Sequence, residues 1–368
     1  MAEKRWTIRE YTPGDEAKIV ALFERVFGKP MGATESASHW RWEYEGNPCG
    51  SPAIELVWDG DRLVGQYAVS PRRLWVHGQE RLAGLSIDTM TDPDYGRQGI
   101  FSASAEACYA AMTERGFGFV YGFPNANSIG GFERRLGWSM VMPTPVLAKP
   151  LDLGDFVAGK LGAPVLGPAI GAPIRAVSHV PRLIDQALGA VRMPRGGPRL
   201  EVRTFDAFGP WVDELWARCR DQHRVWVIRD AAFLRWRYDD RPESDYVRLQ
   251  VLAQGEVAGY AVVTLSQRTQ GLAAFVMDLL VDVQVPGAVS ALLRAIEAHA
   301  RDGGAHLLSA MVGPASPLKP WLLRHAYLPL PERFFPQELH FGARALADDV
   351  RVHEPSAWQL TWGDVDVL

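Results

Sequence analysis

The clearest chemical pattern in this chain is a short run between a predicted strand and a predicted helix: Gly96, Arg97, Gln98 and Gly99. The apolar residues 82–90 predict the strand, and Pro93 ends it because proline lacks the N–H that a ladder needs. From Ile100 the apolar residues follow helical spacing. The first N–H groups of a helix have no internal acceptor, and glycine lets a ligand approach the backbone closely. The pattern indicates a phosphate cradle, although two glycines before a helix also occur in ordinary turns.

The wider run 91–101, TDPDYGRQGIF, resembles the acyl-CoA loop that follows the fourth strand of the GNAT acetyltransferase superfamily. Gly96 and Phe101 stand where that family usually has Arg or Gln and Gly or Ala. Residues 124–138, PNANSIGGFERRLGW, are similar to its last block, where an Asn opens a helix that ends in L-G-[F/W]. Asn127 would open this helix and Leu136-Gly137-Trp138 would close it. The resemblance covers about the first 150 residues.

The resemblance implies contacts for acetyl-CoA. The pantetheine arm would pair with the fourth strand, and the pyrophosphate would lie on the loop and the helix start. The expected cofactor contacts are Thr89, Met90, Thr91, Gly96, Arg97, Gln98, Gly99, Ile100, Phe101, Asn127 and Phe132. Phe132 stands where many relatives carry a Tyr that protonates the leaving thiolate, and Tyr121 is the expected substitute.

Transfer to an amine also needs a base, because an amine with a pKa of ~10.4 is mostly protonated at neutral pH. Asp88 is the carboxylate on the predicted fourth strand and is the first candidate. Glu43 and His39, on a predicted helix at 36–45, are the alternatives. Each of the three also suits a structural role. Cys108 lies on an apolar helical stripe and is expected in the core.

The elements that would position these residues predict an α/β fold, in which a mixed, mostly antiparallel sheet has helices on both faces. Residues 6–11 predict a strand and residues following Pro13 a helix with Leu22 on its apolar face. Residues 54–58 and 63–69 predict a hairpin around Gly60, followed by a strand at 74–76. The tryptophans Trp40, Trp42, Trp211 and Trp216 suit either core packing or stacking on a ring substrate.

An internal repeat with an offset of 194 residues suggests a duplicated domain. Trp42-Glu43-Tyr44 recurs as Trp236-Arg237-Tyr238, and Gly65 recurs as Gly259. We expect two tandem GNAT-like domains: an acyl-CoA-binding domain at 1–150, a linker with a short helix (181–191) at 151–199, and a second domain at 200–368. In the second domain Pro286 removes an N–H at the equivalent loop beside Gly287, so we expect a degenerate cofactor loop and a scaffold role.

Length and composition limit the alternatives. The 368 residues suit two domains, and a net charge of −4 does not favour nucleic acid. Three cysteines are too few for a disulfide framework or a zinc site, so no metal and a reducing cytoplasm are expected. Residues 156–177 are apolar but contain three prolines and four glycines, which predicts a packed linker rather than a transmembrane segment. Peripheral membrane contact and the oligomeric state stay open.

Together these patterns predict an acyl-CoA-dependent N-acetyltransferase. The acetyl group of acetyl-CoA would pass directly to the amine of a small molecule, such as an amino sugar or an amino-acid derivative, in a ternary complex. The alternative is a non-catalytic acyl-CoA-binding or regulatory module.

Overall fold

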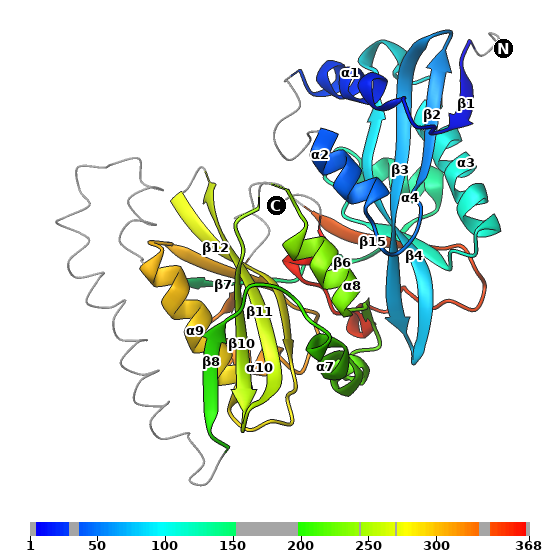
Figure 1. Cartoon of the computed structure of the whole chain (residues 1–368). Helices are drawn as coiled ribbons and strands as arrows, with labels where there is room; N and C mark the ends of the chain where they lie inside the picture. Colours follow the sequence, from blue (N-terminus) through cyan, green and yellow to red (C-terminus); the bar gives the residue numbers. More distant parts are fainter. Residues whose placement is uncertain are drawn as a thin grey trace.

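The computed structural model describes residues 5–28, 37–151, 198–242, 244–268, 271–330 and 339–365, arranged around two mixed sheets (Figure 1). The predicted linker helix at 181–191 and the apolar stretch 156–177 lie outside the described residues. Within the described ranges, no helix is long and apolar enough to cross a membrane. The same ranges contain no group of three or more His, Cys, Asp or Glu residues that could hold a metal ion.

The first sheet has the strand order β1-β2-β3-β4-β5-β15-β6, and β9 pairs with the end of β3. Neighbouring strands are antiparallel except for β4 and β5. The bounds are Thr7–Glu10 (β1), Ala53–Asp59 (β2), Arg62–Val76 (β3), Gln79–Thr91 (β4), Phe119–Gly122 (β5), Ser139–Pro143 (β6), Val225–Val227 (β9) and His340–Ala345 (β15). The helices are Glu16–Phe27 (α1), Ala37–Trp40 (α2), Ile100–Glu114 (α3) and Ile129–Leu136 (α4), with a π-helical turn at Arg41–Glu45 (η2) and a 3-10 turn at Pro93–Tyr95 (η3).

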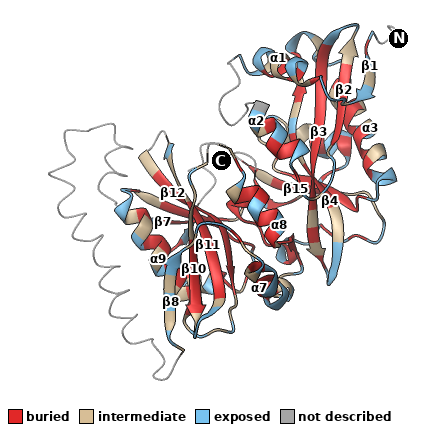
Figure 2. Cartoon of the chain, viewed as in Figure 1, coloured by how far each residue is buried: buried red, intermediate tan, exposed pale blue. Residues whose placement is uncertain are grey.

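Helices cover both faces of this sheet, as predicted (Figure 1). Successive strand residues point to opposite faces, so Val120 and Tyr121 of β5 belong to different cores. Tyr121 shares its core with Leu22 of α1, whereas Val120 shares its core with Cys108 of α3. Figure 2 shows the buried residues along the strands and the inner sides of the helices. Cys108 is fully buried, which confirms its predicted place in the core.

One strand is longer than the sequence predicts. Residues 63–69 and 74–76 form a single strand, β3, that runs through Pro71. The pairing between β2 and β3 ends at Val69. Pro71 lies beyond this end, so its lack of an N–H costs no hydrogen bond to β2. Proline therefore does not break this strand.

The second sheet has the order β14-β7-β13-β12-β11-β10-β8. Its bounds are Val146–Pro150 (β7), Leu200–Thr204 (β8), Val247–Ala253 (β10), Glu256–Arg268 (β11), Gly271–Val281 (β12), Leu307–Met311 (β13) and Leu328–Pro329 (β14). The α-helices are Trp211–Cys219 (α7), Ala231–Leu234 (α8), Ala288–Asp302 (α9) and Lys319–Arg324 (α10). Shorter turns lie at Arg220–Gln222 (η4), Arg235–Asp239 (η5, π-helical), Pro355–Ala357 (η7) and Trp362–Asp364 (η8).

The two sheets exchange a strand. Strand β7 follows the first sheet in sequence but pairs with β13 and β14 of the second. Strand β15 lies near the end of the chain but pairs with β5 and β6 of the first. The domain boundaries at 150 and 200 stay a prediction, and we call residues 1–150 and 200–368 the first and second halves. The first sheet therefore contains β9 and β15 from the second half, and the second sheet contains β7 from the first half.

One pair of residues related by the 194-residue offset, Trp42 and Trp236, meets in space. The Trp42 indole N–H donates to the Trp236 carbonyl at 2.6 Å, and the Trp236 indole N–H donates to the Trp42 carbonyl at 2.7 Å. Their rings stack at 4.9 Å with an interplanar angle of 15°. Both tryptophans are buried. Of the two predicted uses for Trp42, the structure therefore supports packing, here between the halves.

Candidate active site

The predicted phosphate loop is anchored at its start and exposed at its tip. Asp92 is buried and accepts hydrogen bonds from Arg25 at 2.9 Å and from Arg62 at 2.8 Å. Burial raises the pKa of Asp92, but these two guanidinium groups outweigh it and lower the pKa below its usual value. Residues 96–99 are all exposed. The loop is therefore fixed beside the sheet while its backbone faces solvent.

Helix α3 begins where the sequence predicts, at Ile100. Gly99 is its N-cap with φ +80°, a conformation that side chains rarely adopt, and no atom lies within 4 Å of where its Cβ would be. Arg97 also has a positive φ, of 63°. Ile100 is buried, and a Cβ on Gly65 of β3 would lie 2.5 Å from it. The helix start therefore sits directly on the sheet, with its first N–H groups beside the exposed glycines.

Strands β4 and β5 separate just past their parallel pairing. The ladder joins only residues 83–85 to residues 119–121. Beyond Leu85, the described residues give β4 no partner on that side, whereas β3 continues to pair up to Thr91. We call this opening, bordered by residues 86–91 and 122–125, the β4–β5 split. Thr89, Met90 and Thr91 lie along it, and Met90 has a buried side chain, so only its backbone is available there.

Asp88 stands at an irregularity in β4 beside the β4–β5 split. The β3–β4 register shifts between Gln66 and Ala68, and Asp88 has φ +51°. Gln66 is buried and its Nε2 donates to the Asp88 carbonyl at 2.9 Å. The Asp88 side chain is exposed and accepts a hydrogen bond from the Tyr44 hydroxyl at 2.7 Å. This places an accessible carboxylate next to an unpaired strand edge.

The other two candidate bases differ in their surroundings. Glu43 is buried and its carboxylate lies 2.7 Å from the Arg72 guanidinium. Burial raises the pKa of Glu43, but attraction to Arg72 and hydrogen bonds lower it below its usual value. Glu43 is therefore held as a permanent ion pair. His39 is half-buried, with its ring 4.9 Å from Trp42.

Tyr121 does not reach the β4–β5 split, contrary to the expectation that it protonates the leaving thiolate. It is completely buried, with its ring 5.8 Å from Trp358 and 6.1 Å from Phe341. Burial raises the pKa of its hydroxyl, which has no hydrogen-bond partner among the described residues. A proton donor must contact the leaving group, so Tyr121 is a core residue here.

The predicted contacts on α4 are also placed differently. Helix α4 ends at Leu136, followed by Gly137, as predicted. It does not open at Asn127: Asn125 accepts from the N–H groups of Asn127 and Ser128 and so forms the turn before the helix. Asn127 is exposed. Phe132 is buried with its ring 5.4 Å from Phe101, so it supports the helix start rather than lining an open surface.

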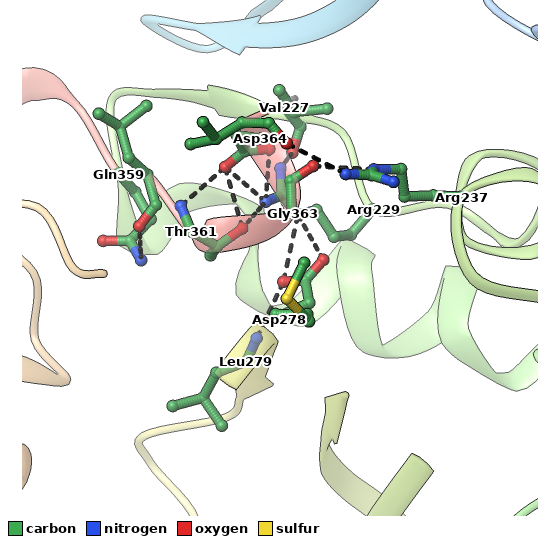
Figure 3. A network of polar contacts seen from close by, with 12 residues as sticks. Val227, Arg229, Arg237, Asp278, Leu279, Gln359, Thr361, Gly363 and Asp364 are labelled. Carbon is green, nitrogen blue, oxygen red and sulfur yellow. Dashed lines mark hydrogen bonds and ion pairs between the residues drawn. The ribbon is translucent and has the colours of Figure 1, made fainter. Parts of the chain in front are cut away.

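The second half has the same tyrosine–aspartate contact, but it is closed. The Tyr238 hydroxyl donates to Asp278 at 3.3 Å, and Asp278 is buried. Figure 3 shows Arg229 between Asp278 and Asp364, with Nε 3.2 Å from the first carboxylate and Nη2 2.9 Å from the second. Burial, only partly offset by Arg229, raises the pKa of Asp278, because one cation is shared by two carboxylates.

The C-terminal segment covers this second aspartate. The Trp362 ring packs 5.6 Å from Phe275 of β12, and its indole N–H donates to Ser309 of β13 at 3.1 Å. At Gly363 a Cβ would lie 1.9 Å from the Tyr238 hydroxyl, so the segment is in direct contact with the pair. Residues 358–365, the C-terminal segment, therefore occupy in the second half the region that stays exposed around Asp88 in the first.

A cavity of about 380 Å³, lined by charged and aromatic side chains, lies elsewhere, between Arg73 and Trp75 of β3 and Trp216 and Asp230 of the second half. Arg73 pairs there with both Glu80 and Asp230. These residues lie at the opposite end of β3 from Gly65, which pairs with Thr91 beside the phosphate loop. The cavity is a charged junction between the halves and is not part of the candidate active site.

Tyr44 and the C-terminal segment were not identified from the sequence as parts of a site. The signal for Tyr44 was present, since it belongs to the repeated Trp-x-Tyr run at the 194-residue offset. No local pattern linked Asp364 to Arg229, which stands 135 residues away.

Comparison with known proteins agrees with this arrangement. Residues 7–141 match the acetyltransferase (GNAT) domain family. No curated protein matches the chain in sequence.

Solved structures match across both halves. A GCN5-related N-acetyltransferase from Anabaena variabilis has a TM-score of 0.63 and 13% identity, over 93% of this chain and 73% of its own. A protein from Enterococcus faecalis described as a "Probable N-Acyltransferase" has a TM-score of 0.60 and 12% identity, over 93% and 72%. A GCN5-related N-acetyltransferase from Kribbella flavida has 0.57 and 14%, over 92% and 71%.

At these identities the structural likeness shows the fold, while the family match assigns the domain. Residues 7–141 are a GNAT acetyltransferase domain, and the protein is an enzyme of the acetyltransferase class.

Proposed function

We propose that the first half transfers an acetyl group from acetyl-CoA to the amine of a small molecule at the β4–β5 split. The observation that carries the proposal is the alignment of three features: the exposed loop 96–99, the start of α3 and the unpaired edge of β4 that bears Asp88. Free N–H groups at a helix start suit a pyrophosphate, and Arg97 adds a cation. An unpaired strand edge suits the amide groups of a pantetheine arm.

The reaction needs a proton acceptor and a polarised carbonyl. Asp88 would take the proton from the acceptor's ammonium group, directly or through water. The amine nitrogen would then attack the thioester carbon, and a backbone N–H of the split would stabilise the oxyanion. As the tetrahedral intermediate collapses, the C–S bond breaks, the nitrogen releases its second proton to solvent, and the thiolate takes a proton from solvent. A thiolate is a stable leaving group, so the burial of Tyr121 is compatible with turnover.

The closed second half supports one site per chain. Its aspartate is buried, paired with Arg229 and covered by the C-terminal segment. A small-molecule acceptor is favoured because the sequence has no acidic or basic tract that would suit a protein tail or nucleic acid. An amino sugar or an amino-acid derivative fits this requirement.

The proposal is tested by measuring CoA release over a panel of amines with the native protein and the Asp88→Asn variant. We expect turnover of at least one amine, and a decrease in kcat of about 10²–10⁴ in the variant with unchanged acetyl-CoA affinity. Asp206→Asn is the matched control, because Asp206 is an exposed carboxylate of the second half, outside the acyl-CoA loop. Tight acetyl-CoA binding without turnover of any amine would instead favour the non-catalytic module.

A further inference from the structure

Tyr44 holds its hydroxyl in a fixed position. It is 1% exposed and lies in the π-helical turn η2, with its ring 5.0 Å from Trp40. The same turn contains Trp42, which is locked to Trp236 of the second half by two hydrogen bonds and ring stacking. The turn that carries Tyr44 is therefore tied down from both the first-half core and the second half.

The hydroxyl of Tyr44 donates to a carboxylate on the exposed side of β4. An exposed aspartate normally samples several rotamers. Asp88 is restrained at both ends: Gln66 donates to its carbonyl at 2.9 Å, and Tyr44 donates to Oδ2 at 2.7 Å. Hydrogen bonds to an ionised acceptor are stronger than those between neutral groups and also favour the charged form.

The second half provides an internal comparison. Tyr238, at the 194-residue offset from Tyr44, also contacts an aspartate, but its hydroxyl lies 3.3 Å from both Asp278 Oδ2 and the Met277 carbonyl. There the aspartate is buried and neutralised by Arg229. The tyrosine–aspartate contact thus occurs in both halves, but only the first half leaves the carboxylate accessible. If the contact were purely structural in both halves, removing either tyrosine hydroxyl would have the same effect on kcat.

We propose that Tyr44 is a positioning residue that orients Asp88 toward the acceptor amine and that the second half, through Trp236, supports this geometry. The inference rests on the proposed function of Asp88. Tyr44 itself does not touch the reacting atoms; it acts through the carboxylate. Removing its hydroxyl should therefore change kcat and leave acetyl-CoA binding alone.

The test is a double-mutant cycle in the CoA-release assay with the full chain. Tyr44→Phe should lower kcat about tenfold, the size expected for one hydrogen bond to a charged group, with unchanged KM for acetyl-CoA. In the Asp88→Asn background the same change should have no further effect on kcat. Tyr238→Phe is the matched control and should keep full kcat. The melting temperatures of Tyr44→Phe and Tyr238→Phe show how much stability is lost when each buried hydroxyl is removed.

The outcomes separate this inference from the proposed function. A slow Asp88→Asn variant with a fully active Tyr44→Phe variant overturns the role of Tyr44 alone. An equal fold decrease on removing the Tyr44 hydroxyl in both backgrounds also overturns it, because the effect then does not pass through Asp88. A fully active Asp88→Asn variant overturns the role of Asp88 and this inference together.

Discussion

Replacing Glu55 with Gln should stabilise the protein at high pH and have no effect at low pH. Glu55 lies on β2, 8% exposed, opposite Glu10 of β1 on one side and Tyr67 of β3 on the other. Burial, and to a lesser degree repulsion from Glu10, raises the pKa of Glu55 to about 7. The folded protein therefore holds a carboxyl group that prefers to be neutral.

The size of the effect follows from the pKa values. In the unfolded chain Glu55 titrates near 4.5, and in the folded protein near 7, a gap of about 2.5 pH units. At 1.36 kcal/mol per pH unit the gap corresponds to about 3 kcal/mol. Below pH 4.5 Glu55 is protonated in both states, and its contribution to the free energy of unfolding is fully present. This contribution decreases as the pH rises from 4.5 to 7 and is absent above that range.

Urea unfolding at several pH values measures this directly. Gln is neutral throughout, so the variant's free energy of unfolding should equal the native value near pH 4.5 and exceed it by up to about 3 kcal/mol at pH 8. Glu10→Gln, which removes only the weaker repulsion, should give a smaller gain. A Glu55→Gln variant that gains the same stability at pH 4.5 and pH 8, or none at pH 8, would refute the reasoning.

Two further predictions concern the two halves. Gly99→Ala and Gly287→Ala should each destabilise the protein by about 1–2 kcal/mol, because both glycines cap a helix with φ near +80°, at 80° and 82°. Calorimetry should give one acetyl-CoA per chain, weakened only by Gly99→Ala; weakening by Gly287→Ala would place the phosphates elsewhere. Asp364→Asn leaves Arg229 paired with Asp278 but weakens the hydrogen bonds that the Asp364 carboxylate accepts from Arg229 and Thr361, and should lower the free energy of unfolding by about 1.5–3 kcal/mol in urea. Its acetyl-CoA affinity should not change, and a loss of affinity at native stability would argue against a closed second half.

Local signals predicted the parts of the fold that depend on neighbouring residues. The start of α3 at Ile100 followed from Gly99 and helical periodicity, and the end of α4 followed from Leu136-Gly137. The same reasoning predicted separate strands at 63–69 and 74–76, because whether one strand can continue through Pro71 depends on where its neighbour ends. It also selected Asn127 rather than Asn125 for the turn before α4, since both residues suit a turn.

Long-range pairings were beyond a local pattern. The offset of 194 pointed to a repeat, but not to Trp42 and Trp236 touching one another. Asp88 was a candidate because it is a carboxylate on a strand, whereas its positive φ and its contact with Tyr44 depend on the register of β3 and β4. Tyr121 was misjudged because the residues that bury it, such as Trp358, lie more than 200 positions away.

The strand exchange has a consequence for synthesis on the ribosome. β15 lies between β5 and β6, so until residues 340–345 have been translated β6 has no partner strand and β5 is paired only with β4. About 200 residues separate β6 from β15, which takes ~10–40 s at ordinary elongation rates. During that interval the nascent first half exposes two unpaired strand edges, the kind of surface that pairs with other chains. The strands β1–β6 of the GNAT domain are therefore translated well before β15, the strand that completes their sheet.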